Sequence, residues 1–590
     1  MRQKKNFFST ILSYMTYQEK KQPKAFYIPE YDEQENKEGK EKDSPAKDSG
    51  NKGGQGKTRG IIKPTPVPEA AGKERENQAD DKAISKDINQ NLNYLKAKFN
   101  APDNKDIVIR EFLIAEKYSA FIVYLEGMVD RITINNFILR PLLKTGKINE
   151  ENKECKLDFI LKNIIETNQT KEITSHDEAV YDILSGNTLL YVDGCSFYIS
   201  NETKGYDKRG VEKPQTEGVV IGPQEAFNET LRTNITLLRK IIKNNNLTTE
   251  FIKVGEKNQN LCAVMYIKGL TNPAIIDEVK RRIKGIKADF IMGEGFIAQF
   301  IDDNPFSLLP SYLNTERPDK TAAHILEGKV AVLSEGTPFS IIVPVTAQEL
   351  VQSPEDSFMR WQYGSFIRII RLISLIFAMM LPGLYVAVTT FHQEMIPTDL
   401  LIAIAKAKEQ VPFPTLVEVI LMEISFELIR EAGIRIPGII GNTLGIIGAL
   451  ILGQAAVQAN IVSPILIIVV AITGLGNFAI PNFSVAFGVR IVRFVFIAGG
   501  AFMGFYGISI AFIITLGLFT NLKSFGVRMF SPISPKTRKS KDYIFRWPIW
   551  KQEFRPDYVN PLDLRRQADT SRQWAKEDPN YTYEREEKDD

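Results

Sequence analysis

The sequence is poor in the residues that most catalytic chemistry needs. Its 590 residues include only three cysteines and three histidines. Cys155, Cys195 and Cys262 form no Cys-x-x-Cys pair, so neither a disulfide framework nor a zinc site is predicted. The histidines lie far apart in the sequence and give little support to metal or triad chemistry. We therefore expect no enzyme activity, no cofactor and no bound metal ion.

The chain also lacks a strong charge of one sign and a secretory leader. Its 74 basic and 71 acidic residues leave a net charge of +3, which gives no overall signal for nucleic acid. The early apolar run Phe7–Met15 is short, mixed with polar residues, and has no small-residue cleavage site. We expect the amino-terminal part to stay in the cytoplasm and to bind no nucleic acid.

Aromatic residues are missing from most of the first 90 positions. None lies between Tyr31 and Tyr94, where Lys, Glu, Asp, Gly and Pro dominate. Such a composition buries too little apolar surface to offset the entropy of ordering, so residues 1–90 are predicted to be a disordered charged arm. The sequence GGQGKT within it resembles the end of a phosphate-binding loop, but Asn51 stands where that pattern needs glycine. We interpret this stretch as a linker.

The stretch 91–345 alternates between two kinds of pattern. Short apolar runs bounded by turn residues predict strands, whereas apolar residues at three- or four-residue steps predict helices. The predicted strands are 120–125, 188–193 and 261–267, and the predicted helices are 87–99, 135–143, 225–243 and 273–286. This alternation and length predict two α/β subdomains. The fold class is therefore multi-domain: a cytoplasmic α/β part of two subdomains, followed by an all-α polytopic membrane domain.

Long uncharged runs dominate 346–525, which we predict to be a transmembrane helical domain. Runs of this length can cross a bilayer core of about 30 Å, and about four of them are present. Pro382 and Gly383 lie inside the first run, where they predict a kink and are candidates for a gate. The amphipathic stretch 400–411 is predicted to lie at the membrane interface. The predicted spans are 372–391, 443–457, 463–480 and 494–522.

Basic residues follow the last apolar run. Between Lys523 and Arg546 the only acidic residue is Asp542, and 526–590 reads as a basic and then charged tail. An excess of Lys and Arg beside a span is typical of the cytoplasmic side, so both termini are predicted to be cytoplasmic. Arg490 and Arg493 argue against this topology, because it would place them on the outer side of the membrane or at its interface.

An acidic segment, 412–437, interrupts the uncharged runs. Glu423, Glu427 and Glu431 are each four residues apart and share one helical face, whereas Glu418 is rotated away. Like charges at this spacing repel, so the carboxylates need water, cations or arginines such as Arg430 and Arg435. Two interpretations stay open. The carboxylates line a cation path or its vestibule, or they form structural ion pairs in an interfacial helix.

Four stretches resemble the A subunit of the GerA-type spore germinant receptors, a family that also includes the stage V sporulation protein AF. The similarity covers roughly 90–545, and several of its motifs are long and unusual. The stretches are GPQEAFNETLRTNITLLR (222–239), NPFSLLPSYLNTERPDKTAAHILEGKVAVLSEGTPFSIIVP (304–344), PFPTLVEVILMEISFELIREAGIRIP (412–437) and GNTLGIIGALILGQAAVQANIVSPILIIVVAITGL (441–475).

The resemblance implies an integral protein of the inner spore membrane that works with a transporter-like B subunit and a lipoprotein C subunit. In this family the B subunit binds the nutrient. The A subunit is a homo-oligomer, a pentamer, that forms a nutrient-gated channel for monovalent cations in contact with membrane lipids. Its opening starts germination. The candidate ion path would contain Glu423, Glu427 and Glu431.

Two alternatives stay open. The stage V sporulation protein AF type would be an accessory germination channel, and co-purification with B and C subunits would distinguish a receptor from it. The second alternative is a non-conducting transporter or scaffold. A transporter should contain repeats with broken helices in corresponding positions, and no convincing duplication is found in this sequence.

Overall fold

The computed structural model describes residues 84–114, 116–144, 164–165, 169–205, 213–435, 448, 451–535, 537 and 542–567. The chain divides into two compact units. Within the described residues, the first unit comprises 84–102 and 106–205, and the second comprises 103–105 and the chain from 213 onward. Residues 1–83 of the predicted disordered arm lie outside the described residues.

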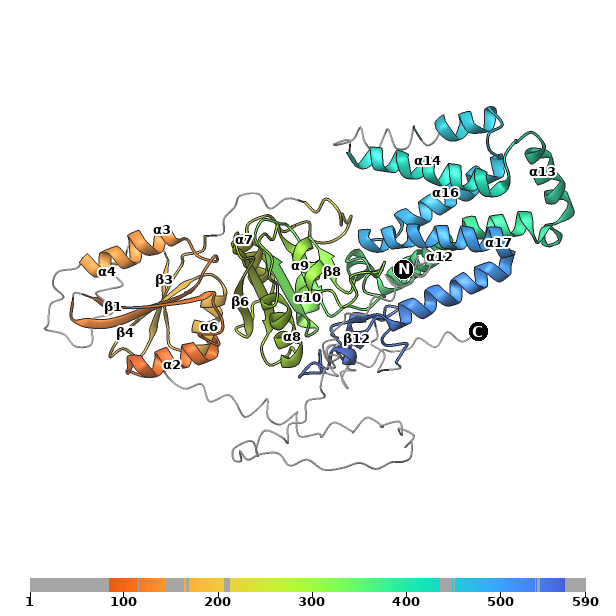
Figure 1. Ribbon diagram of the computed structural model, residues 1–590. Coiled ribbons are helices and arrows are strands. Elements are labelled where there is room, and N and C mark those ends of the chain that lie inside the picture. Colours follow the sequence, from red (N-terminus) through yellow and green to blue (C-terminus); the bar gives the residue numbers. More distant parts are fainter. Residues whose placement is uncertain are drawn as a thin grey trace, which may run out of the picture. The chain divides into compact units, whose positions relative to one another are not determined.

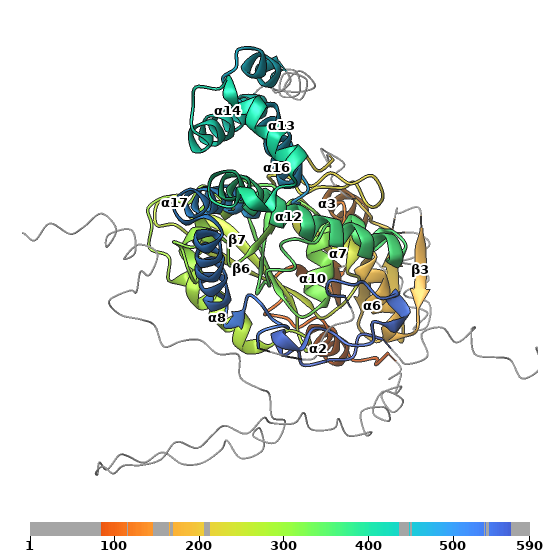
Figure 2. The ribbon, with the colours of Figure 1, turned by 90° about the vertical axis from the view of Figure 1, so that its right-hand side faces the viewer.

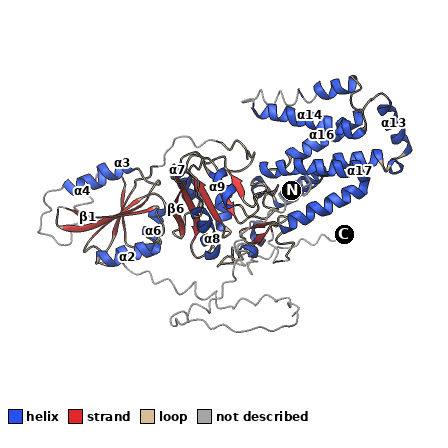
Figure 3. Ribbon diagram, in the orientation of Figure 1, coloured by secondary structure: helices blue, strands red, loops and turns tan. Residues whose placement is uncertain are grey.

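The first unit is a five-stranded antiparallel sheet with helices on both faces (Figure 3). Strand β4 shows why both faces are covered. Leu189 and Tyr191 pack under α2 and α6, whereas Leu190 and Val192 pack under the π-helix Ile134–Leu139 and α4, so the strand is buried on both faces. The strands, in sheet order, are β1 Ile107–Ile114, β2 Tyr118–Leu125, β4 Thr188–Val192, β5 Tyr198–Asn201 and β3 Thr170–Ile173. The helices are α2 Ile88–Lys98, α3 Arg131–Thr133, a π-helix Ile134–Leu139, α4 Arg140–Lys144 and α6 His176–Leu184.

The second unit begins with another five-stranded antiparallel sheet (Figure 1). Helices α7 and α10 cover one face, and α8 and α9 cover the other. The strands, in sheet order, are β6 Leu247–Val254, β7 Asn260–Ile267, β9 Val330–Ser334, β10 Ser340–Val343 and β8 Leu313–Thr315. The helices are α7 Leu231–Ile241, α8 Pro273–Lys284, α9 Glu294–Ile301 and α10 Pro318–Leu326.

The two sheets share one topology. In both, the strands follow the spatial order first, second, fourth, fifth, third, and a helix precedes the opening hairpin. The prediction of α/β architecture in this part of the chain is confirmed. The sequence did not indicate that the same arrangement occurs twice.

One predicted helix begins later than expected. The pattern predicted a start at 225, but α7 begins at Leu231, after Thr230 as the N-cap. The fully buried Arg317 explains the difference, because its guanidinium donates hydrogen bonds to the carbonyls of Glu217 at 3.1 Å and Pro223 at 2.9 Å. These bonds hold the preceding chain in a non-helical path.

The rest of the second unit is mainly helical. Two of its helices, α12 and α17, are long and apolar enough to cross a membrane by length and composition, and α16 is a shorter apolar helix. The expected four spans are therefore not confirmed within the described residues, and much of the predicted span 443–457 lies outside them. The helices are α11 Glu355–Phe358, α12 Trp361–Thr390, α13 Thr398–Glu409, α14 Thr415–Arg435, α16 Pro464–Phe478 and α17 Phe483–Asn521.

Helix α17 is not one straight rod. At Gly504 the backbone leaves helical geometry, with φ 59° and ψ −138°, and the chain turns back on itself (Figure 1). A left-handed φ of this kind is readily adopted only by glycine. The predicted span 494–522 is thus divided between two arms, one on each side of Gly504.

Helix α12 continues through Pro382 and Gly383 and lies beside α17 (Figure 2). A Cβ atom on Gly383 would lie only 2.5 Å from the carbonyl oxygen of Phe496, and one on Gly500 would meet the Gly383 carbonyl. Glycine therefore permits a close backbone contact between the two helices, as small residues do in membrane bundles. The kink and gate predicted at Pro382 and Gly383 stay predictions.

This contact gives a stability prediction. We expect Gly383→Ala to destabilise the helical region by about 1–3 kcal/mol, because the added methyl group meets backbone atoms that cannot rotate away. Thermal unfolding of the full chain in detergent measures the effect. Gly517→Ala is the matched control, since a Cβ there meets nothing within 4 Å. Equal melting temperatures for the two variants would contradict the prediction.

Candidate functional site

Helix α14 carries the acidic segment, and its first carboxylate already has a structural role. Glu418 is buried and accepts a hydrogen bond of 3.0 Å from the backbone N–H of Ser463. Ser463 is the N-cap of α16. A carboxylate there complements the positive end of the helix dipole. Glu418 therefore joins the start of α14 to the start of α16.

Glu423 makes the most deeply buried ion pair of α14. Its partner is Arg493 of α17, and the two side chains are 1% and 2% exposed. The Nε–H of Arg493 donates to the carbonyl of Ala378 in α12, at 2.7 Å. One arginine therefore connects α12, α14 and α17.

Glu427 continues the same face and also has arginine partners. It pairs with Arg430 one turn further along α14, and with Arg490 of α17 at 3.2 Å. The Arg490 guanidinium lies 3.8 Å from the ring centroid of Phe487, a cation–π contact. Glu431 is exposed, and the Arg435 side chain lies outside the part of the chain that the structure describes.

The outward surface of α14 is apolar. Val417, Ile424 and Leu428 are exposed, whereas Glu423 faces the interior of the helical region. Glu423 and Glu427 are thus turned toward α17, whereas Glu431 is exposed. Sequence analysis did not name Arg490 and Arg493 as partners. The available signal was two arginines three positions apart in an otherwise uncharged stretch.

Several atoms of this site keep unused hydrogen-bonding capacity. Among the described residues, Glu418 Oε1, Glu423 Oε1, Arg430 Nε and Arg493 Nη2 are buried without a hydrogen-bond partner. Buried polar atoms are usually satisfied, so each such group needs an explanation. Water, an ion or a neighbouring subunit would supply the missing partners. The site therefore has hydrogen-bonding capacity that the packing of these helices does not use.

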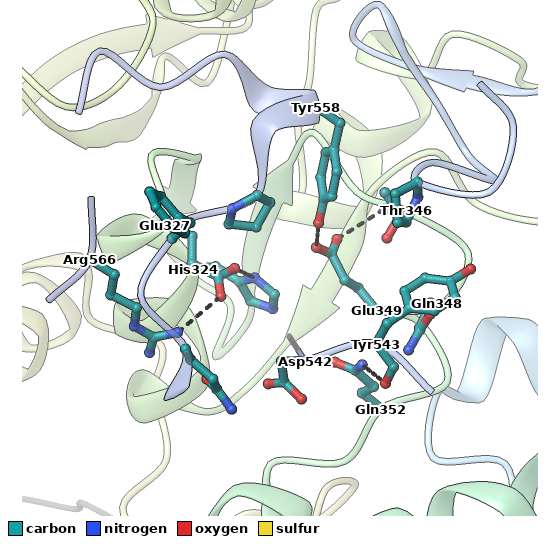
Figure 4. Close-up of a pocket in the computed structure, with 14 residues that line it drawn as sticks. His324, Glu327, Thr346, Gln348, Glu349, Gln352, Asp542, Tyr543, Tyr558 and Arg566 are labelled. Carbon is teal, nitrogen blue, oxygen red and sulfur yellow. Dashed lines mark hydrogen bonds and ion pairs between the residues drawn. The ribbon is translucent and has the colours of Figure 1, made fainter. Parts of the chain in front are cut away.

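A second polar cluster lies where the carboxy-terminal segment 542–567 contacts the second sheet (Figure 4). The ammonium group of Lys329, which is fully buried, lies 2.5 Å from Glu349 and 3.1 Å from Nδ1 of His324. Tyr558 donates its hydroxyl hydrogen to Glu349 at 2.5 Å. His324, Glu349 and Tyr558 line a cavity of about 60 Å³.

Burial and charge shift the pKa values in this cluster. Burial and the Lys329 charge both disfavour the imidazolium, so the pKa of His324 lies below its usual value. Burial alone would raise the pKa of Glu327, but its interactions with His324, Lys329 and Arg566 outweigh burial and lower that pKa to about 2. The pKa of Glu349 is also lowered, because Lys329 and His324 outweigh burial.

The same cluster has ligand atoms at metal-binding spacing. One atom each from His324, Glu327 and Glu349 lies within 4.8 Å of the others. However, Lys329 already supplies a positive charge there, at hydrogen-bonding distance from two of the three groups. A metal ion would have to displace that buried ammonium, so these residues do not fit a resident metal.

The comparisons with known proteins define the family. The model of the Bacillus/Clostridium GerA spore germination protein matches residues 93–558. Spore germination protein KA of Bacillus subtilis (strain 168) is 39% identical over 483 residues, which cover 81% of this chain and 88% of that protein. Spore germination protein GerLA of Bacillus cereus is 35% identical, covering 78% of this chain and 93% of that protein. This chain therefore belongs to the GerA family of spore germination proteins.

A solved structure is also similar in sequence. It is the crystal structure of the N-terminal domain of the A subunit of the Bacillus megaterium spore germinant receptor GerK3. The sequence identity is 31%, the match covers 44% of this chain and 95% of that chain, and the TM-score is 0.36. The family model and the curated relatives confirm the resemblance to the GerA family.

The buried pair can be tested by a double-mutant cycle. We expect Arg493→Met to destabilise the helical region by about 3–5 kcal/mol, because Glu423 then keeps a buried charge without a partner. Adding Glu423→Gln should recover a large part of that loss. Unfolding of the full chain in mixed detergent measures both. Arg528→Met, at an exposed position, is the control. Additive effects of the two changes would show that the pair is not coupled.

The lowered pKa values give a pH prediction. In the folded protein these groups hold fewer protons than in the unfolded chain, so stability is present at high pH and falls as pH is lowered. The loss should begin below pH 6.5 for His324 and below pH 4.5 for Glu327, continuing to about 2. Thermal unfolding across this range measures the slope. His324→Gln should remove the first part of the decline and weaken the second, because the interaction with His324 also lowers the pKa of Glu327. An unchanged profile would contradict the prediction.

Proposed function

We propose that this chain is the A subunit of a spore germinant receptor. It resides in the inner membrane of the spore, forms a homo-oligomer and acts as a nutrient-gated channel for monovalent cations. Membership of the GerA family supports the receptor role. Two long apolar helices, α12 and α17, support a membrane location. A transporter-like B subunit that binds the nutrient and a lipoprotein C subunit are the proposed partners.

The buried Glu423–Arg493 pair is the observation that carries the channel proposal. Ionisable groups inside apolar helices are costly and commonly belong to ion pathways. In the described conformation arginines neutralise Glu423 and Glu427, so the carboxylates are not available to cations. Opening would separate α14 from α17 and expose the carboxylates to water. Cations would then replace the arginines as their partners.

A signal from a partner must reach these helices through packed contacts. A ligand shifts a conformational equilibrium only by binding one state better than the other. The second sheet offers a direct route, because Leu313, Ile342 and Val345 share one apolar cluster with Ala378 of α12 and Val489 of α17. A displacement of β8 or β10 would therefore move both long helices. Val489 adjoins Arg490 and lies one turn from Arg493.

Ion flux through liposomes that contain the reconstituted receptor tests the channel proposal. We expect Glu427→Gln and Glu431→Gln to reduce the selectivity for potassium over chloride, because a neutral amide attracts cations less strongly than a carboxylate. Glu409→Gln, at an exposed position of α13, is the matched control and should leave selectivity unchanged. Unchanged flux and selectivity in the test variants, with intact assembly, would show that these carboxylates do not line the ion path.

A separate assay tests the receptor assignment. Affinity purification of the tagged chain from spores should recover a transporter-like protein and a lipoprotein. Their absence, together with germinant-independent flux from the chain alone, would favour the accessory channel type instead.

A further inference from the structure

A second group of polar side chains lies at the end of the helical region that is remote from the second sheet. There α13 runs beside α16 and the start of α14 (Figure 1). Four helices contribute to this group, which we call the Lys408 cluster. Its members are Tyr385 of α12, Lys408 of α13, Thr415 and Glu418 of α14, and Ser463 at the N-cap of α16.

The Lys408 side chain points from α13 into the cluster. It lies one turn after the buried Ile404, so both side chains are on the face of α13 that is turned toward the other helices. The ammonium group of Lys408 donates a hydrogen bond to the hydroxyl oxygen of Thr415. It also lies 5.9 Å from the ring centroid of Tyr385, which is cation–π distance, and the Glu418 carboxylate attracts it.

The two carboxylate oxygens of Glu418 are used unequally. The side chain is 1% exposed, and its Oε2 accepts the backbone N–H of Ser463 at 3.0 Å. Its Oε1 is buried without a hydrogen-bond partner among the described residues. A buried charged oxygen is costly unless a donor or a cation is bound to it. Lys408 supplies a positive charge nearby, but its hydrogen bond goes to Thr415, so Oε1 of Glu418 keeps the capacity to bind a ligand.

The groups around the Lys408 ammonium are chemically suited to a monovalent cation. They are one carboxylate, one hydroxyl oxygen and one aromatic face, from Glu418, Thr415 and Tyr385. One carboxylate balances one positive charge. Calcium takes about six to eight oxygen ligands and commonly several carboxylates, which is more than these three side chains provide. The ammonium group is itself a monovalent cation, tethered to α13 by the lysine side chain.

We propose that Tyr385, Thr415 and Glu418 form a binding site for a monovalent cation such as potassium, and that the Lys408 ammonium group occupies this site in the described conformation. When α13 withdraws Lys408, the free oxygen of Glu418 and the hydroxyl oxygen of Thr415 bind the ion in its place. In a cation channel, Lys408 then acts as a plug at this end of the helical region. That consequence rests on the proposed function, whereas the binding site does not.

Unfolding of the full chain in detergent, in potassium chloride and in choline chloride of equal concentration, tests the site without any need for ion conduction. Lys408→Met keeps an apolar stem but removes the ammonium group. In this variant we expect potassium to raise the melting temperature by at least about 2 °C over choline, because an ion that binds only the folded chain stabilises it. The unsubstituted chain should melt at the same temperature in both salts, since Lys408 excludes the ion.

Lys406→Met is the matched control, because Lys406 is an exposed lysine of the same helix, and it should show no difference between the salts. The double variant Lys408→Met/Glu418→Gln should also show none, since the carboxylate provides the charge of the site. Lys408→Gln, which keeps a donor for Thr415, repeats the test if the Met variant does not fold. Equal melting temperatures in the two salts for the Lys408 variant would overturn the proposal and leave Lys408 with a packing role alone. A potassium effect that persists in the double variant would also overturn it.

Discussion

Charge placed among apolar helices constrains the whole helical region. Arg490 and Arg493 lie in α17, which is otherwise uncharged, and each needs a carboxylate and hydrogen-bond acceptors when buried. Glu427 and Glu423 of α14 supply the carboxylates, and the Ala378 carbonyl of α12 is a further acceptor for Arg493. The positions of three helices therefore follow from two arginines. The same constraint makes the site sensitive to helix movement, because a buried charge that loses its partner must pair with another group or become hydrated.

Close glycine contacts complement the ion pairs. Gly383 and Gly500 bring the backbones of α12 and α17 together, which places Ala378 within reach of Arg493. Gly504 then reverses the chain so that the second arm of α17 leads back toward the second sheet, where Ser524 accepts a hydrogen bond from the Val345 N–H. A residue with a Cβ atom at these positions would separate the helices. Ion pairing and close packing are thus two requirements on the same interface.

Elements with strong local patterns were predicted from the sequence. Elements whose position depends on contacts with residues distant in the sequence were not. Strands β2, β4 and β7 are continuous apolar runs, and their positions were predicted to within two residues. Strands β8 and β10 are too short to have a pattern of their own, and Arg317 delays the start of α7 through side-chain bonds that no local pattern reveals. The duplicated topology was hidden because it resides in strand order rather than in repeated residues.

The candidate site divides in the same way. Helical spacing placed Glu423 and Glu427 on one face correctly, because that depends only on the helix period. Their partners on α17 are 63 and 70 residues away in the sequence, and only the folded chain brings them together. Likewise, His324 is isolated from the other histidines in sequence, yet folding brings it to Lys329, Glu349 and the carboxy-terminal segment.

The carboxy-terminal segment joins the second sheet and the helical region of the second unit by polar contacts at two points. At one, Tyr558 binds Glu349 and the N–H of Leu562 binds the Leu270 carbonyl. At the other, Asp542 pairs with Arg368 of α12, which also binds Asp356. Buried ionic contacts lose most of their stabilisation when one partner leaves, so each attachment tends to hold or release as a unit. A displacement of the loop that carries Glu349 would therefore reach the base of α12 through this segment as well as through the apolar core.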